Sequence, residues 1–127
     1  MMRNILIADD SRVYVHLISG WLNDRGFKVL VASDAIQAFV MATKHQPEAV
    51  ILDISMPAGS GIDVLKKLKL SPKTRGIPVL VVTGNGGNEM RSFVKRLGAT
   101  DLLEKPLDCA EFSAAFGRLT GETVASS

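Results

Sequence analysis

The sequence predicts an α/β domain in which a five-stranded parallel sheet is covered by five helices, some on each face. Five short apolar runs of strand length recur along the chain, and segments with helical spacing lie between them. The runs are rich in Val, Ile and Leu and do not alternate with polar residues, which is typical of strands buried on both faces. Strands that are separated by helix-length crossovers pair in parallel.

The first predicted strand, Ile5–Ala8, leads into a helix whose apolar residues recur at steps of three and four. Gly26 stands where a glycine commonly ends a helix. We therefore expect one face of this helix to pack on the sheet. The apolar residues of that face are Val13, Leu17, Ile18, Trp21 and Leu22.

The second predicted strand, Val29–Val31, is followed by a helix that begins after Ser33, an N-cap residue type, and stops before Pro47. The third strand, Ala49–Leu52, precedes a helix that ends at Ser71–Pro72. The apolar residues of this third helix are Ile62, Leu65 and Leu68.

The fourth predicted strand, Val79–Val82, is followed by a helix that ends at Gly98. The fifth strand, Leu102–Leu103, leads into a last helix with an aromatic core face. That face carries Phe112, Phe116 and Leu119. Beyond it the chain lacks a core pattern, so we expect one domain over residues 1–120 and a flexible tail over residues 121–127.

Composition and charge narrow the class of protein. A chain of 127 residues with 46% hydrophobic residues can bury the core of one domain. The single cysteine, Cys109, cannot form an internal disulfide, and the N-terminus does not resemble a secretory signal, so we expect a cytoplasmic protein. No apolar stretch approaches the roughly 18 residues that span a membrane, so no membrane partner is expected. Basic residues are dispersed among acids without interleaved aromatics, so we expect no direct nucleic-acid contact.

Polar side chains stand at the carboxyl ends of four of the five predicted strands. In an open parallel sheet these ends meet at one edge, where binding sites form. We therefore expect the polar residues to lie close together in the folded protein. They are Asp9 and Asp10 after the first strand, Asp53 after the third, Thr83 at the end of the fourth, and Lys105 just beyond the fifth; Gly84, which follows Thr83, adds a backbone N–H.

These residue types predict phosphoryl chemistry with a metal ion. Three carboxylates in one cleft repel each other unless a cation offsets them, and oxygen ligands with open water positions suit Mg²⁺. A carboxylate such as that of Asp53 can act as a nucleophile toward phosphorus and form an aspartyl phosphate. Mg²⁺, the Lys105 ammonium and the Thr83 hydroxyl with the Gly84 backbone N–H can compensate the phosphoryl oxygens.

Each residue also has a structural interpretation when it is taken alone. An Asp at a strand end is commonly a helix N-cap, a Thr there is commonly a β-branched strand residue, and Lys-Pro is a common loop pair. Their joint occurrence at the strand ends of one sheet favours the functional interpretation.

Four segments of the chain carry a further signal: ILIADDSR, VILDISMPAGSGIDVLKKLK, IPVLVVTG and GATDLLEKPL. Together they resemble the receiver domain of two-component response regulators, of the chemotaxis-regulator type. The resemblance covers Asn4 to about Leu119, and the spacing of Asp53, Thr83 and Lys105 is typical of that family. It implies a flavodoxin-like, doubly wound sheet with strand order 2-1-3-4-5.

The resemblance further implies a role for each site residue. Asp53 would take a phosphoryl group from a histidine kinase or a histidine phosphotransfer protein. Asp10, Asp53 and the backbone carbonyl of Ser55 would bind Mg²⁺ directly, whereas Asp9 would act mostly through water. The Lys105–Pro106 bond would be cis, which is accessible for a bond before proline.

The function that the resemblance implies is that of a signalling module rather than an enzyme. The module would assist its own phosphorylation and dephosphorylation at Asp53, and phosphorylation would switch partner binding in two-component signal transduction or a phosphorelay. A downstream protein partner would meet the face made by the fourth helix, fifth strand and fifth helix.

One departure from the family leaves an alternative open. Receivers usually carry Tyr, Phe or His three residues before the lysine, whereas this chain has Leu102. A phosphorylation-independent docking module therefore remains a second interpretation. A phosphatase would require an Asp-x-Asp pattern, which the adjacent Asp9 and Asp10 do not supply, and a flavin carrier would require a less acidic loop after the first strand.

Overall fold

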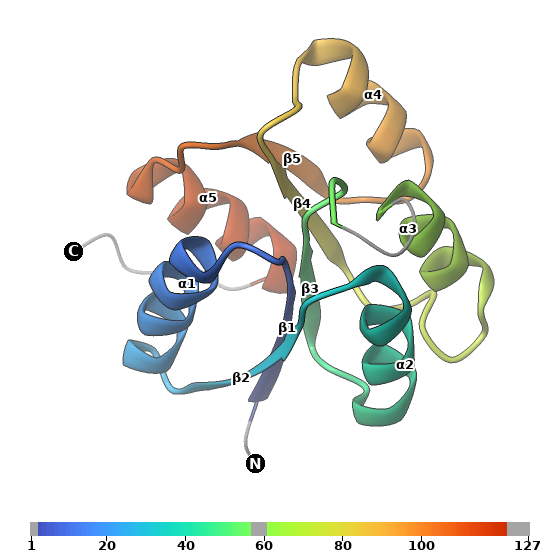
Figure 1. Ribbon diagram of the computed structural model, residues 1–127, viewed down its shortest axis with the longest axis horizontal. Helices are drawn as coiled ribbons and strands as arrows, with labels where there is room; N and C mark the ends of the chain where they lie inside the picture. The colour runs from blue at the N-terminus through green and yellow to red at the C-terminus, as the bar shows by residue number, and fades with distance from the viewer. Residues whose placement is uncertain (1–2, 57–60, 122–127) are drawn as a thin grey trace.

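The computed structural model describes residues 3–56 and 61–121, so most of the predicted tail lies outside the described residues. Five parallel strands form one sheet in the order β2-β1-β3-β4-β5, which confirms the predicted fold (Figure 1). The strands are β1 (Arg3–Ala8), β2 (Phe27–Ala32), β3 (Ala49–Leu52), β4 (Val79–Thr83) and β5 (Asp101–Glu104). The helices are α1 (Arg12–Asp24), α2 (Ala35–His45), α3 (Gly61–Leu70), α4 (Asn88–Arg96) and α5 (Cys109–Thr120).

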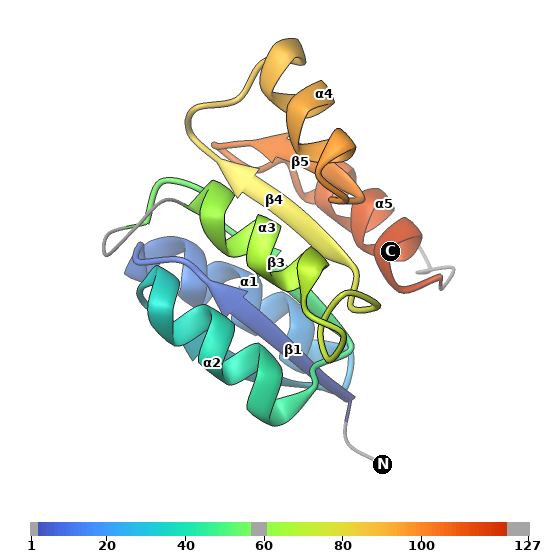
Figure 2. The ribbon, with the colours of Figure 1, turned by 90° about the vertical axis from the view of Figure 1, so that its right-hand side faces the viewer.

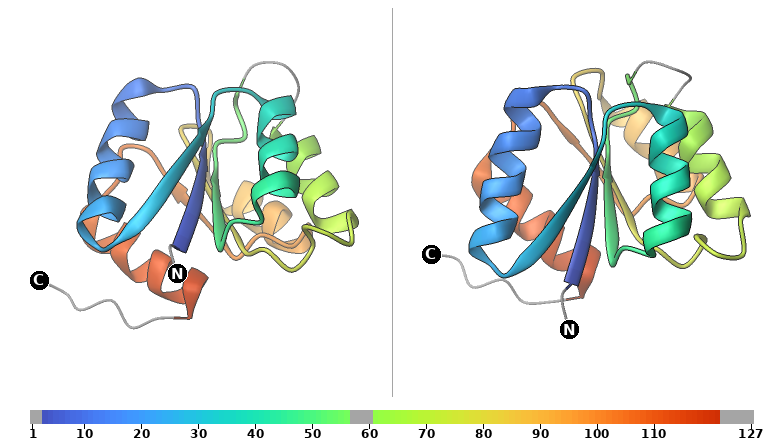
Figure 3. Two further views of the ribbon diagram at one scale, coloured as in Figure 1. Left: turned by 90° about the horizontal axis from the view of Figure 1, so that it is seen from below. Right: turned by 60° about the horizontal axis from the view of Figure 1, so that its bottom comes forward.

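The sheet separates two helical layers. Helices α1 and α5 cover one face, and α2, α3 and α4 cover the other (Figure 3). In β1, Leu6 and Ala8 belong to the core under α2, α3 and α4, whereas Ile5 and Ile7 belong to the core under α1 and α5. The central strands are therefore buried on both faces, as their continuous apolar runs predict.

Strand β2 differs from that expectation because it lies at an edge of the sheet. It pairs only with β1, and Val31 is 42% exposed. An edge strand has one neighbour and is only partly covered by helices, so a short apolar run does not ensure burial there. The prediction that every strand is buried on both faces is wrong for β2.

The predicted core face of α1 is too wide. Ile18 and Leu22 are buried, but Val13 and Leu17 are 73% and 55% exposed. Trp21 is half-buried and packs edge-on against two rings of α5, those of Phe112 and Phe116. Helical spacing identifies an apolar stripe, whereas the sheet and α5 determine how much of that stripe they cover.

Helix α2 begins one residue later than predicted. Asp34, not Ser33, is the N-cap, because Asp34 Oδ1 accepts a hydrogen bond of 2.8 Å from the Gln37 N–H. The Gln37 side chain in turn accepts the Ser33 N–H at 2.9 Å. The reciprocal pair resembles a capping box, in which Gln37 Oε1 also accepts the Ser33 hydroxyl at 3.5 Å.

Parallel strands bring their carboxyl ends to the same edge of the sheet, as the arrows of β1 and β4 illustrate in Figure 2. The loops after β1, β3, β4 and β5 start from this edge. Among the described residues, no helix is long and apolar enough to cross a membrane.

Candidate functional site

Two carboxylates project from the ends of the central strands. The Asp9 N–H donates to the Ala32 carbonyl at 3.0 Å and the Asp53 N–H to the Ala8 carbonyl at 2.8 Å, so the sheet hydrogen bonding extends to both residues. Each is only 4% exposed, whereas the neighbouring Asp10 is exposed. Carboxylate oxygens of Asp9, Asp10 and Asp53 lie within 4.8 Å of one another. We call these three residues the acidic cluster.

Lys105 brings a positive charge to the acidic cluster. Its Nζ lies 2.9 Å from Asp9 Oδ2 and 3.2 Å from Asp53 Oδ2, and its side chain is 13% exposed. The Lys105 N–H donates to the Thr83 carbonyl at 2.9 Å, which fixes the loop after β5 beside the end of β4. The Lys105–Pro106 peptide is cis, as the family resemblance implies.

Ser55 contacts Asp53 in a way that sequence reasoning missed. Its N–H and its hydroxyl both donate to Asp53 Oδ1, at 2.9 and 2.7 Å. The Ser11 N–H makes the equivalent bond to Asp9 Oδ1 at 2.9 Å. The sequence could have indicated both bonds, because each serine stands two residues after its aspartate and an Asp side chain commonly accepts the N–H of that residue.

The other two predicted residues lie at the end of β4. Thr83 is completely buried, and its hydroxyl accepts the Asn85 N–H at 3.2 Å. Gly84 follows it in an exposed position. Strand β4 lies between β3, which leads to Asp53, and β5, which leads to Lys105. Thr83 therefore ends the strand between them. The predicted residues thus come from one edge of the sheet.

Burial and hydrogen bonding act in opposite directions on the two buried carboxyl groups. Burial raises the pKa of Asp9, and its bonds to Lys105 and Ser11 only partly offset that effect. Burial also opposes ionisation of Asp53, but the two Ser55 bonds and Lys105 outweigh it and hold its pKa below the usual value. For Lys105, burial favours the neutral amine, but its two carboxylate partners raise the pKa overall. At neutral pH, Asp53 is therefore an anion facing an ammonium group.

Replacing Asp9 by asparagine is expected to raise the melting temperature of the metal-free protein near neutral pH by a few degrees. Burial raises the pKa of Asp9, so its ionisation costs stability in the folded state. That cost is absent at pH values below the ordinary pKa of 3.8, where Asp9 is protonated in both the folded and the unfolded state. It is complete at pH values above the folded-state pKa. The asparagine oxygen can still accept the Ser11 N–H.

Thermal melts of both proteins between about pH 4 and about pH 7 test this expectation. The advantage of Asp9→Asn should grow as the pH rises. Equal melting temperatures at the upper pH would contradict it.

Tyr14 is a site residue that the sequence reasoning did not identify. The Lys105 Nζ lies 4.3 Å from the centroid of the Tyr14 ring. A cation at that distance from a ring face is attracted to it. The periodicity of α1 carries no sign of this contact, because it depends on where the loop after β5 places the lysine.

Leu102 is completely buried and belongs to the core under α2, α3 and α4. Its carbonyl accepts hydrogen bonds from Arg91 of α4, at 3.3 and 3.0 Å. Arg91 also lies 3.4 Å from the Asp101 carboxylate, which is 3.5 Å from Arg118 of α5. These contacts connect α4, β5 and α5.

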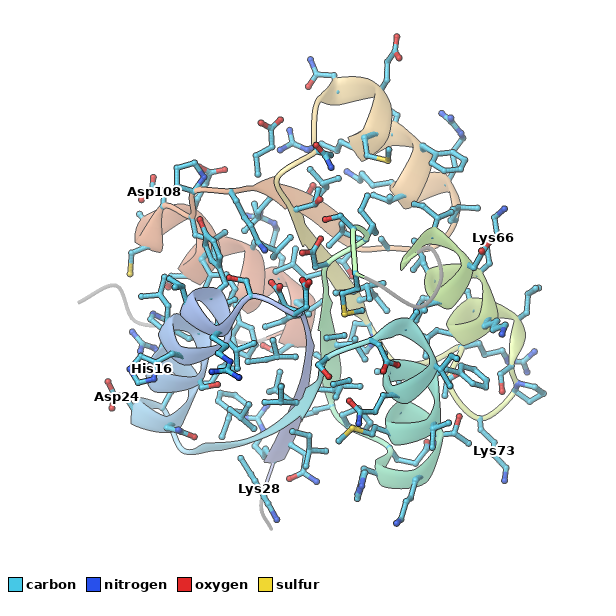
Figure 4. All side chains as sticks on the ribbon, in the orientation of Figure 1. His16, Asp24, Lys28, Lys66, Lys73 and Asp108 are labelled. Atoms are coloured by element: carbon cyan, nitrogen blue, oxygen red, sulfur yellow. The ribbon has the colours of Figure 1, made fainter. Side chains whose placement is uncertain are left out.

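The acidic cluster has the donor set of a Mg²⁺ site. It offers three carboxylate oxygens that can approach one ion, and hard oxygen ligands are those that Mg²⁺ prefers. Side chains such as His16 and Lys66 lie on exposed helix surfaces, outside this edge of the sheet (Figure 4). Fold and site define a class of protein, an α/β module with a candidate cation site facing a lysine at the carboxyl edge of its sheet.

Comparison with known proteins identifies the family. Residues 5–116 match the response regulator receiver domain family. Protein PilH of Pseudomonas aeruginosa is 34% identical over 107 residues, which cover 84% of this chain and 88% of PilH. The chain belongs to the response regulator receiver domain family, whose members are signalling modules of two-component systems.

Two further relatives extend the comparison. Response regulator PleD of Caulobacter vibrioides is 36% identical over 120 residues, and the match covers 94% of this chain but only 26% of PleD. A solved receiver domain of the sensor histidine kinase PA1611 from Pseudomonas aeruginosa has 25% identity and a TM-score of 0.84, covering 96% of this chain and 100% of that one. That structure holds a magnesium ion coordinated in its active-site cleft.

Proposed function

We propose that this chain accepts a phosphoryl group on Asp53 and thereby switches its binding to partner proteins. The observation that carries the proposal is the pairing of the Asp53 carboxylate with the Lys105 ammonium at 3.2 Å, beside two further carboxylates. A nucleophile whose pKa is held low is ionised at neutral pH. Membership of the receiver family supports the same function.

In the proposed reaction, a carboxylate oxygen of Asp53 attacks the phosphorus of a phosphohistidine. The new P–O bond forms as the P–N bond breaks, and the electron pair of that bond stays on the imidazole nitrogen. Lys105 compensates charge on the phosphoryl oxygens, with the Thr83 hydroxyl and the Gly84 N–H as further donors. The two Ser55 hydrogen bonds hold one carboxylate oxygen, so the other is oriented for attack.

Mg²⁺ would be held by Asp10, Asp53 and the Ser55 carbonyl, with Asp9 acting mostly through water. When bound, the ion supplies positive charge that offsets the carboxylates and the phosphoryl oxygens. The metal-binding PA1611 receiver supports this assignment.

The partners we propose are a histidine kinase or histidine phosphotransfer protein as donor and a downstream protein on the α4-β5-α5 face. The connected side chains of Arg91, Asp101 and Arg118 lie on these elements and support that choice. A docking module that does not require phosphorylation is the second candidate, and the observation that favours it is the buried aliphatic Leu102 in place of an aromatic ring.

Intact mass spectrometry after incubation with phosphoramidate, with and without Mg²⁺, tests the proposal. The native protein should gain a single phosphoryl adduct that requires Mg²⁺, and Asp53→Asn should gain none. Asp108→Asn is the matched control, because Asp108 is an exposed cap of α5 outside the acidic cluster. An adduct that persists in Asp53→Asn would move the acceptor elsewhere, and no adduct in the native protein would favour the docking module.

A further inference from the structure

The Lys105 ammonium has an aromatic neighbour as well as its acidic ones. The Tyr14 ring centroid lies 4.3 Å from Nζ, while oxygens of Asp9 and Asp53 lie at 2.9 and 3.2 Å. The negative face of an aromatic ring attracts a cation within about 6 Å, and the attraction is stronger where water is excluded. Since the Lys105 side chain is only 13% exposed, the contact lies in such a place.

The ring is held by the start of α1. Tyr14 lies in the first turn of that helix, where its backbone N–H donates to the N-cap hydroxyl of Ser11 at 3.4 Å. Its side chain is half-buried and packs against the core under α1 and α5. The Ser11 N–H is in turn bonded to the Asp9 carboxylate. The helix start therefore links the ring to the acidic cluster through the backbone.

The ammonium contacts two carboxylates and the Tyr14 ring, and only the carboxylates would also bind other groups during the reaction. Asp9 and Asp53 are also the groups that Mg²⁺ would engage, and Asp53 is the group that would be phosphorylated. The face of the Tyr14 ring repels an anionic phosphoryl group and is not a ligand for Mg²⁺, which prefers oxygen atoms. It is the contact that can persist while the carboxylates change partners.

We propose that Tyr14 is a positioning residue for phosphoryl transfer, whose ring face keeps the Lys105 ammonium at the acidic cluster while Asp9 and Asp53 exchange ligands. This inference rests on the proposed function and deepens it. Tyr14 does not touch the reacting atoms, because it acts through Lys105. The attraction depends on the electron density of the ring, which separates it from ordinary packing.

The test replaces Tyr14 by phenylalanine, by its mono-, di- and trifluoro derivatives, and by leucine, and measures the rate of phosphoryl uptake from phosphoramidate. Tyr14→Phe should stay within about twofold of the native rate, because the ring face remains. The rate should fall stepwise with each fluorine, which withdraws ring electrons with little change of shape. Tyr14→Leu should be about fivefold slower, equal to about 1 kcal/mol.

A second readout follows the contact without metal or phosphoryl donor. In NMR spectra of the metal-free protein, the ε-methylene protons of Lys105 should be shifted upfield by the ring in the native protein and in Tyr14→Phe. The shift should vanish in Tyr14→Leu. Lys105→Arg, which lacks these lysine signals, assigns them.

The outcomes separate this inference from the proposed function. Native uptake that is indifferent to fluorination would overturn the role of Tyr14 and leave the phosphoacceptor function standing. An unshifted Lys105 signal in the native protein would overturn the contact itself. No uptake by the native protein would overturn both. If Tyr14→Leu fails to fold, the fluorine series still decides, because those variants keep the shape of the ring.

Discussion

Lys105→Met is expected to slow phosphoryl uptake by about 100-fold, the loss typical of removing one donor that stabilises developing negative charge. The ammonium lies within hydrogen-bond distance of both Asp9 and Asp53. Methionine at position 105 supplies no positive charge to either carboxylate. Loss of the lysine also leaves buried carboxylates without their cation, which should lower the stability of the metal-free protein by about 3 kcal/mol. Uptake is measured by intact mass over time and stability by urea unfolding.

The stability loss should depend on pH in a defined direction. Lys105 holds the pKa of Asp53 down, so its contribution is present above the unfolded-state pKa and disappears as the pH falls through the folded-state value. Lys66→Met is the matched control, because Lys66 is exposed on α3 and its loss should change neither quantity. Uptake by Lys105→Met at the native rate would remove the lysine from the mechanism.

Gly61→Ala is expected to destabilise the protein by about 3 kcal/mol, at the upper end of overpacking effects. Gly61 is the first residue of α3, and its N–H donates to the Ile54 carbonyl at 3.1 Å. A Cβ there would clash with the Ile54 backbone and would lie 2.8 Å from the Asp53 carbonyl oxygen. Because these atoms are backbone, relief of the clash must move the segment that carries Asp53, the proposed nucleophile. Phosphoryl uptake should therefore fall by about tenfold.

Gly20→Ala is the matched control for this substitution. Gly20 is an exposed residue inside α1, and no atom lies within 4 Å of the position that its Cβ would occupy. Alanine there should stabilise the protein by about 0.5–1 kcal/mol through helix propensity and leave uptake unchanged. If urea unfolding gives both variants the same stability, the close approach of the Ile54 backbone to Gly61 does not destabilise Gly61→Ala.

The fold was predictable from the sequence where burial is complete. The apolar runs of β1, β3 and β4 are typical of strands covered on both faces, and the structure covers them. The prediction failed at β2 and at the outer residues of α1, where burial depends on how far a neighbouring layer extends. The misplaced cap at Ser33 has a local cause, because two adjacent polar residues could each begin the helix and side-chain geometry decides between them.

The acidic cluster was predictable because topology alone brings the ends of parallel strands together. Residue type at a strand end was then sufficient to select Asp9, Asp53 and Lys105, which the structure joins by hydrogen bonds. The Ser55 hydroxyl and the Tyr14 ring were not found, because their contributions depend on rotamers and on the path of a loop. Sequence patterns report which face a residue occupies and carry no record of what it touches there.

The hydrogen bonds from Arg91 to the Leu102 carbonyl bear on how this chain tolerates change. Arg91 donates to the backbone of β5, so these bonds do not involve the side chain of residue 102. These hydrogen bonds are thus independent of the residue type at position 102, whereas the buried Leu102 side chain packs in the core under α4. A residue that fits the volume of the core can therefore replace Leu102 while these hydrogen bonds continue to hold α4 against β5.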